Sequence, residues 1–222
     1  MAAIVGISGI TGGYVGSTPV NALYLGADLV WSAQTSYTFV AAISGGSDAV
    51  ITLSIDPANI STGAEITVRG YVQDSMFYDP QPSNQFNFLE VNPNEAASFG
   101  VARVSGDLKM FWFGGNDMVY YNAIPAADEE YIGWGLSKDG IFDKIHDTWL
   151  VTGTSLTSIY PSGTFDVYVD NFQWRDLQVR DNGVVLFNGV SAIRSSDGQG
   201  GLLDTVSNTF YTDPNHRIYT RQ

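Results

Sequence analysis

The side chains best suited to chemistry in this sequence are its carboxylates, since twenty-three Asp and Glu stand against ten Lys and Arg. Polysaccharide-cleaving enzymes that retain configuration use two carboxyl groups about 5–5.5 Å apart. Residues i and i+2 of one strand, or residues facing across neighbouring strands, give such a spacing. Asp166 and Asp170 lie four residues apart, roughly 13 Å along a strand. The acidic run Asp128-Glu129-Glu130 is typical of a solvated loop or helix start, so no catalytic residue is predicted.

Aromatic rings are the second candidates, because sugars stack on exposed Trp and Tyr beside hydrogen-bonding groups. Successive side chains of a strand point to opposite faces of the sheet. In Phe111–Phe113 and in Tyr120-Tyr121, one of any two adjacent rings must therefore face away from the core. Trp134, within Ile132-Gly133-Trp134-Gly135, is exposed if it lies on a loop. The alternative is that these rings pack in the core or in a subunit interface. The possible ligand-binding aromatics are therefore Trp112, Tyr120, Tyr121 and Trp134.

Metal and nucleophile chemistry has little support in the sequence. The two histidines, His146 and His216, form no His-x-x-x-His pair, and the chain has no cysteine. Ca²⁺ is the one metal with candidate oxygen ligands, in Asp197-Gly198 and Gly115-Asn116-Asp117. Turn residues that hydrogen-bond their own backbone explain the same pattern, so no cofactor is expected.

Charge and composition restrict the partners and the fold class. The net charge of −13 and the lack of a basic cluster argue against nucleic acid and against anionic membrane surfaces. No apolar run approaches the roughly eighteen residues that span a bilayer. Charged residues make up only 15% of the chain, while Gly, Tyr, Phe, Ser and Thr are plentiful. This composition favours sheets and turns over helices, and we expect an all-β fold.

Short strands separated by turn clusters recur about every ten residues, as in a sandwich. Residues 124–148 are the least strand-like, and a short helix or ordered loop is expected at 126–130 and 139–147. The expected strands are Thr38–Ile43, Ala49–Ile55, Glu65–Val72, Phe86–Val91, Ser98–Arg103, Leu108–Phe113, Met118–Asn122, Thr148–Val151 and Phe165–Val169.

The apolar residues between 165 and 179 change phase twice. Phe165, Val167 and Val169 share one parity, Phe172 and Trp174 take the other, and Leu177 returns to the first. A one-residue phase change marks a bulge or a bend between sheets. We therefore expect a bulge or a bend between sheets where the phase changes.

The C-terminal quarter gives the clearest local prediction. Leu177–Arg180 alternates apolar and polar residues, Asp181-Asn182-Gly183 follows, and Val184–Phe187 returns. An Asn-Gly pair is the strongest short hairpin signal, because both central positions of a type I′ turn need φ > 0. Two further strands are expected at Leu202–Asp204 and Thr209–Tyr211.

This segment resembles the closing segment of laminin-G-like (concanavalin A-like) jelly-roll domains in virion proteins of tailed bacteriophages. The residues that carry the resemblance are Asp181, Asn182, Gly183, Ser196-Asp197-Gly198, Gly201, Leu202, Leu203, Asp204, Val206, Phe210 and Tyr211. Val20–Trp31 also resembles a short element near the N-termini of phage structural proteins, and it reads as two strands around a Gly-Ala-Asp turn. The resemblance implies a single jelly-roll sandwich and a location in the virion.

The domain prediction is an N-terminal arm with a short β attachment element at 1–33 and a jelly-roll domain at 34–222. The first twenty residues carry no charged side chain and are rich in glycine. A flexible leader is one interpretation. The other is an arm that orders against neighbouring subunits, because apolar β-branched residues should not remain in water. The arm residues are Ile4, Val5, Ile7, Ile10 and Val15.

The expected function is a non-enzymatic virion structural protein: a capsid decoration, head fibre or tail appendage with a possible adhesion role. Its expected partners are other virion proteins and further copies of itself in a homotrimer. The alternative is a carbohydrate-binding module that recognises a host-surface glycan. A polysaccharide depolymerase is the third hypothesis.

Overall fold

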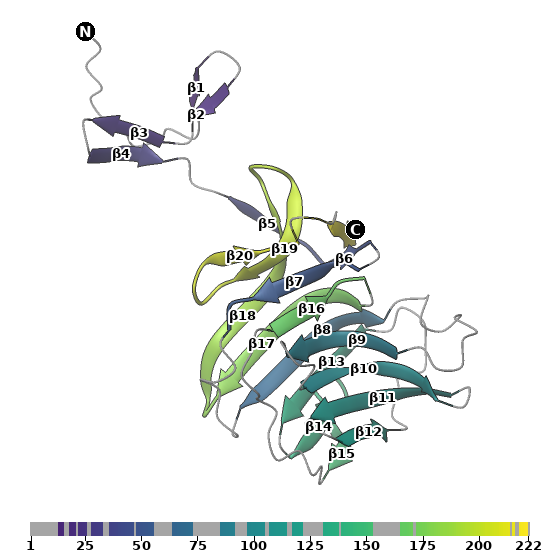
Figure 1. The fold of residues 1–222 in the computed structure, drawn as a ribbon. Helices are drawn as coiled ribbons and strands as arrows, with labels where there is room; N and C mark the ends of the chain where they lie inside the picture. The colour runs from purple at the N-terminus through teal and green to yellow at the C-terminus, as the bar shows by residue number, and fades with distance from the viewer. Residues whose placement is uncertain are drawn as a thin grey trace. The chain divides into compact units, whose positions relative to one another are not determined.

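The computed structural model of the chain is built from antiparallel strands (Figure 1). It describes residues 13–15, 18–20, 22–25, 28–32, 36–46, 48–55, 64–72, 85–91, 97–104, 107–114, 117–121, 131–137, 139–152, 165–170, 172–213, 215 and 218–221. Side-chain surroundings are described for the greater part of these residues from 36 onward. Within the described residues there is no helix, so the all-β prediction is confirmed.

Residue contacts divide the chain into two compact units, 1–37 and 38–222. In the first unit, β1 (Gly13–Val15) pairs with β2 (Thr18–Val20), and β3 (Ala22–Leu25) pairs with β4 (Asp28–Ser32). The second hairpin confirms the two strands predicted in Val20–Trp31. Val15 lies on β1, whereas Ile4, Val5, Ile7 and Ile10 lie outside the described residues. The predicted boundary at 33/34 also falls outside them.

Two large antiparallel sheets form the second unit. The six-stranded sheet has the order β12-β11-β10-β9-β16-β7. Its strands are β7 (Val50–Leu53), β9 (Gln85–Val91), β10 (Ala97–Val104), β11 (Asp107–Gly114), β12 (Asp117–Tyr121) and β16 (Phe165–Tyr168).

The eleven-stranded sheet, called the large sheet below, follows the order β15-β14-β13-β8-β17-β18-β19-β20. β5 pairs with β18, and β6 pairs with both β17 and β21. Its strands are β5 (Tyr37–Phe39), β6 (Ala42–Gly45), β8 (Glu65–Val72), β13 (Tyr131–Ser137), β14 (Gly140–Asp143), β15 (Thr148–Thr152), β17 (Phe172–Asp181), β18 (Val184–Arg194), β19 (Gln199–Asp204), β20 (Thr209–Tyr211) and β21 (Ile218–Arg221).

The expectation of a helix or loop between 139 and 147 is wrong. Gly140–Asp143 forms β14, and a turn at 144–147 connects it to β15. β13 likewise begins at Tyr131, inside the stretch predicted to be least strand-like. Glycines at 133, 135 and 140 weaken the strand pattern in the sequence. In the structure, β13 and β14 pair with each other, and the pairing of β13 with β8 and of β14 with β15 stabilises them as strands. The residues 126–130 lie outside the described part.

A chain of aromatic rings joins the inner faces of the two sheets. Phe88 of β9 stacks on Phe172 of β17 with ring centroids 4.7 Å apart, and Phe99 of β10 meets Trp134 of β13 edge-on at 5.7 Å. Phe88 also contacts Phe99, and Phe172 contacts Trp174. All five rings are buried. The fold is therefore β-sandwich-like, with its core between the sheets.

Both phase changes predicted between residues 165 and 179 are confirmed. The first, between Val169 and Phe172, is where the chain leaves β16 in the six-stranded sheet and enters β17 in the large sheet. The second is a bulge, because Trp174 pairs with Gly70 and Asp176 with Arg69, which leaves Arg175 unmatched. Each change keeps the apolar residues on the core side.

The predicted hairpin at Asp181–Gly183 is also confirmed. Asn182 and Gly183 have φ values of 48° and 82°, as a type I′ turn requires. Asp181 pairs with Val184 across the turn. A β-carbon at Gly183 would have no neighbour within 4 Å, so only the backbone conformation restricts this position.

We expect Gly183→Val to lower the free energy of unfolding by about 1–2 kcal/mol, because a β-branched residue is strained at positive φ. Gly46→Val is the matched control, since Gly46 also has open space around it but no positive φ. Thermal melts of both variants check this, and equal midpoints would contradict the assignment of strain to the turn.

Gly70, unlike Gly46 and Gly183, has no free space for a β-carbon. A β-carbon there would overlap the Gln173 carbonyl oxygen and the Phe172 ring. Gly70→Ala should therefore displace the aromatic chain and lower the unfolding free energy by about 3 kcal/mol, at the upper end of the usual range for overpacking. Urea unfolding against Gly46→Ala measures this, and a loss equal to that of the control would show that the core adapts.

Candidate functional site

Of the four aromatics predicted from the sequence, Trp134 alone has side-chain surroundings that the structure describes. Trp112 lies on β11, opposite Val119 of β12, while Tyr120 and Tyr121 lie on β12 opposite Phe111 and Met110. The structure gives the strand pairing of these three residues but does not describe their side chains.

Trp134 does not meet the condition for a binding residue, which was that it lie exposed on a loop. Trp134 lies on β13 rather than on a loop, and only 3% of it is exposed. Its parity on the strand points it inward, where its ring packs against Phe99. A buried ring cannot stack on a sugar, so Trp134 is removed from the candidate binding residues.

A different aromatic pair occupies the outer face of the large sheet. Trp149 of β15 pairs directly with Phe142 of β14, and their ring centroids lie 5.3 Å apart at 73°. Trp149 is 47% exposed, although it is among the largest apolar side chains in the protein. A bulge at Leu150 separates Trp149 from the rest of the strand register, and Leu150 packs against the core.

The register extends this pair into a row across six strands. Phe142 pairs with Gly135, Gly135 with Thr67, Thr67 with Gln178, and Gln178 with Asn188. Directly paired residues of antiparallel strands share a face. The outer row is therefore Trp149, Phe142, Gly135, Thr67, Gln178 and Asn188, and it spans roughly 24 Å at about 4.8 Å per strand.

Amide and hydroxyl groups occupy the end of the outer row away from Trp149. Gln178 Nε2 donates to Asn188 Oδ1 at 3.1 Å, and Asn188 Nδ2 donates to Thr205 Oγ1 at 2.7 Å. Arg180 Nη2 donates to Gln178 Oε1 at 3.2 Å. These contacts hold both amide groups in fixed orientations on a partly exposed surface.

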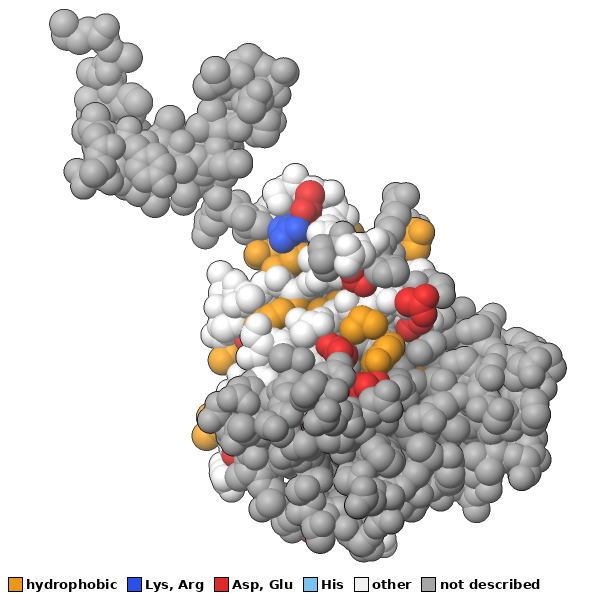
Figure 2. All heavy atoms as spheres, viewed as in Figure 1, with side chains coloured by type: hydrophobic (Ala, Val, Ile, Leu, Met, Phe, Trp, Pro, Cys, Tyr) orange, Lys and Arg blue, Asp and Glu red, His pale blue; other side chains and the backbone are white. Residues whose placement is uncertain are grey.

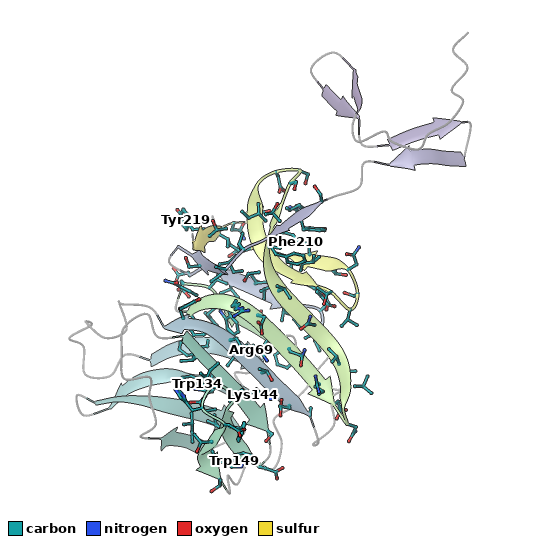
Figure 3. The ribbon with its side chains drawn as sticks, turned by 180° about the vertical axis from the view of Figure 1, so that it is seen from behind. Arg69, Trp134, Lys144, Trp149, Phe210 and Tyr219 are labelled. Carbon is teal, nitrogen blue, oxygen red and sulfur yellow. The ribbon has the colours of Figure 1, made fainter. Side chains whose placement is uncertain are left out.

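The two residues at the centre of the row, Gly135 and Thr67, are buried, and Thr67 Oγ1 donates to Glu65 Oε1 at 3.1 Å. The aliphatic stem of Lys144 lies over Gly135, and Lys144 Nζ reaches Glu65 Oε1 at 2.6 Å. Beside this pair, Arg69 Nη1 bonds Asp176 Oδ1 at 3.0 Å. Figure 3 labels Arg69, Lys144 and Trp149, which follow one another along the sheet. The charged groups at the centre therefore neutralise each other in pairs.

The carboxylates on this outer face lie too far apart for glycoside cleavage. Asp176 pairs with Arg69, four residues along β8 from Glu65. That offset corresponds to roughly 13 Å, beyond the separations of about 5–9.5 Å used by glycosidases.

The other sheet holds one carboxylate pair that sequence reasoning missed. Glu90 of β9 pairs directly with Asp166 of β16, which places their β-carbons about 5 Å apart. Glu90 is only 5% exposed, and Tyr168 Oη donates to it at 2.6 Å. Thr52 Oγ1 donates to Asp166 Oδ1 at 2.7 Å. The Glu90–Asp166 pair therefore has the spacing of two catalytic carboxyl groups, but the burial of Glu90 keeps a substrate from reaching it.

The candidate Ca²⁺ ligand Asp197 is engaged by a cation of the protein itself. Arg194 Nη2 bonds Asp197 Oδ2 at 2.6 Å, and this contact holds the pKa of the Asp197 carboxyl below its usual value. Asp197 Oδ1 also accepts from the Gln199 amide at 3.1 Å. The described residues hold no group of three or more metal-ligating side chains. Gly115 and Asn116 lie outside them.

The other residues of the C-terminal motif have structural roles. Leu202 is buried in the core, and Phe210 lies over Gly201 with the Arg194 guanidinium 5.0 Å from its ring centroid. Tyr211 packs against Phe187 with ring centroids 5.9 Å apart. The motif thus describes how β18, β19 and β20 pack rather than a binding surface.

Asp204 and Asp143 organise two turns in the same way. Each accepts from the backbone amides two and three residues ahead: Val206 and Ser207 for Asp204, Ile145 and His146 for Asp143. Burial alone would raise the pKa of Asp204, but the Ser207 hydroxyl and the Asn188, Val206 and Ser207 amides hold it below its ordinary value. The pKa of Asp143 is lowered in the same manner, with the His146 side chain as the main donor against burial. The second turn carries Lys144 to its position over Gly135.

Comparison with models of known protein families and with curated proteins finds no match. Among the described residues, no helix is long and apolar enough to cross a membrane. The resemblance to phage virion proteins therefore stays an expectation from the sequence, and the outer row is the best-formed candidate site in the described part of the chain.

Asp204→Asn should lower the unfolding free energy at pH 7 by about 1–2 kcal/mol, because hydrogen bonds to the carboxylate lose their charge. A lowered native pKa gives stability that is present above the unfolded-state value near 3.9 and is lost as pH falls through the native value. The difference between the two proteins should therefore shrink below about pH 4. Urea unfolding from pH 7 to pH 2.5 measures it, and a constant difference would contradict the role of the charge.

Proposed function

We propose that this protein is a non-enzymatic structural and attachment protein of a virion, in which a jelly-roll domain is displayed and the N-terminal unit makes assembly contacts. The observation that carries the proposal is the division of the chain into a large sandwich-like unit and a small separate unit of two hairpins. The described core of the sandwich-like unit is built from its own residues, between Ile43 and Ile218.

Two carboxylate pairs of the described residues give little support to an enzymatic role. Glu90 and Asp166 have a suitable separation, but Glu90 is buried and bonded to Tyr168. Glu65 and Asp176 are more accessible but stand too far apart. The depolymerase hypothesis therefore draws less support from the geometry than a binding role does.

The acidity of the chain supports a protein partner over a nucleic acid. Acidic side chains are spread over the described part of the face drawn in Figure 2, and the net charge is −13. Such a surface repels phosphate backbones. Other virion proteins and further copies of this chain are the proposed partners.

A carbohydrate-binding role is the second candidate, and the exposed Trp149 favours it. Sugars bind to exposed Trp rings and to oriented amide groups, and the outer row carries a Trp at one end and two amides at the other. The two roles are compatible, since an attachment protein of a virion can also recognise a host-surface glycan.

Deletion of residues 2–20 tests the assembly role, because it removes β1, β2 and the apolar residues Ile4, Val5, Ile7, Ile10 and Val15. We expect the full-length protein to have the mass of three 24.0 kDa chains and the truncated protein the mass of one. The core lies in the other unit, so the melting midpoint should fall only by the contribution of assembly. Light scattering measures the masses, and a truncated protein with the full-length mass would overturn the proposal.

A further inference from the structure

The outer row has the chemistry of an extended binding strip rather than of a single pocket. It begins at the exposed Trp149 ring with Phe142 beside it on the neighbouring strand, and it ends at the amides of Gln178 and Asn188. Aromatic faces bind the C–H faces of sugar rings, and amides bind hydroxyl groups as both donor and acceptor. One ligand class presents both kinds of surface repeatedly along its length, namely a chain of pyranose units.

The dimensions of the row match such a chain laid across the strands. The inter-strand spacing of about 4.8 Å is comparable to the length of one sugar unit. The row of roughly 24 Å therefore accommodates several consecutive units. Gly135 and Thr67 are buried beneath the Lys144–Glu65 pair, so a ligand that reaches from Trp149 to Gln178 would cross this ion pair.

The two cations at the centre of the row, Lys144 and Arg69, are not free to bind an anionic sugar. Lys144 and Arg69 are each paired with a carboxylate, at 2.6 Å and 3.0 Å. An anionic ligand would have to break these pairs and approach a chain with a net charge of −13. The amide groups carry no net charge and suit neutral hydroxyl groups.

We propose that the outer row binds a neutral oligosaccharide chain, with Trp149 as the stacking residue and Gln178 and Asn188 as hydrogen-bonding residues. This inference rests on the attachment role proposed above, and it gives that role a ligand class and a site.

The test is isothermal titration of the full-length protein with cellohexaose, xylohexaose, mannohexaose, maltohexaose and chitohexaose, with hexagalacturonate as the anionic comparison. We expect saturable binding of at least one neutral hexasaccharide and none of hexagalacturonate. Trp149→Ala and Gln178→Ala should each weaken binding by about tenfold, which corresponds to about 1.4 kcal/mol. The disaccharide of the same sugar should bind more weakly than the hexasaccharide, because it cannot reach both ends of the row.

Tyr219→Ala is the matched control, since Tyr219 is also an exposed aromatic of the large sheet but lies on β21, outside the outer row. It should leave the affinity unchanged. Trp149 lies on an edge strand and is half exposed, so its variant should retain the thermal midpoint closely enough for titration.

Three outcomes would overturn the inference: no binding of any neutral hexasaccharide, binding that both row variants leave intact, or equal affinity for disaccharide and hexasaccharide. Self-association that Trp149→Ala abolishes, without sugar binding, would instead identify the row as an interface between copies. The assembly role is tested separately by the mass of the truncated protein, so the two proposals can fail independently.

Discussion

The contact between Phe88 and Phe172 is the interaction on which the rest of the sandwich-like unit depends. It joins a strand of the six-stranded sheet to a strand of the large sheet, and Phe99, Trp134 and Trp174 extend it in both directions. Two irregularities make it possible. A bulge in β9 places Phe88 beside Leu89 on the core side, and Gly70 leaves room for the Phe172 ring. Large buried rings supply much of the hydrophobic stabilisation in such a core.

The same packing determines what the outer face of the large sheet can display. Because Trp134 points inward against Phe99, its neighbours Gly133 and Gly135 point outward. Those glycines leave the space that Ile145 and Lys144 occupy. The turn stabilised by Asp143 then leads into β15, where Trp149 faces outward beside Phe142. The inner core and the outer row are thus two consequences of one alternating strand.

Local sequence patterns predicted the parts of the fold that depend on local physics. Asn182-Gly183 predicted its turn because positive φ is a property of these two residues. The parity of Phe165 through Val179 predicts two irregularities, because burial forces apolar residues to one side, and the structure identifies them as a sheet crossing and a bulge. The strand β14 was missed because glycines carry no side-chain signal, and its pairing comes from neighbours distant in the chain.

The site was harder to predict for the same reason. Trp149 sits in a segment correctly expected to be a strand, but its exposure depends on the bulge at Leu150, which the sequence does not mark. Trp134 is a candidate only if it lies on a loop, and the pairing of β13 with β8 places it on a strand instead. The facing pair of Glu90 and Asp166 joins residues far apart in the chain, so spacing along the sequence gives no sign of it.

The bulge at Leu150 has a consequence for how this protein behaves at high concentration. β15 ends the large sheet, and a regular terminal strand offers free backbone groups on which another molecule can add a strand. With Leu150 turned toward the core, the backbone on both sides of it loses the even spacing that such an addition requires. The irregularity that presents Trp149 to solvent therefore also protects this border of the sheet against fibrous aggregation.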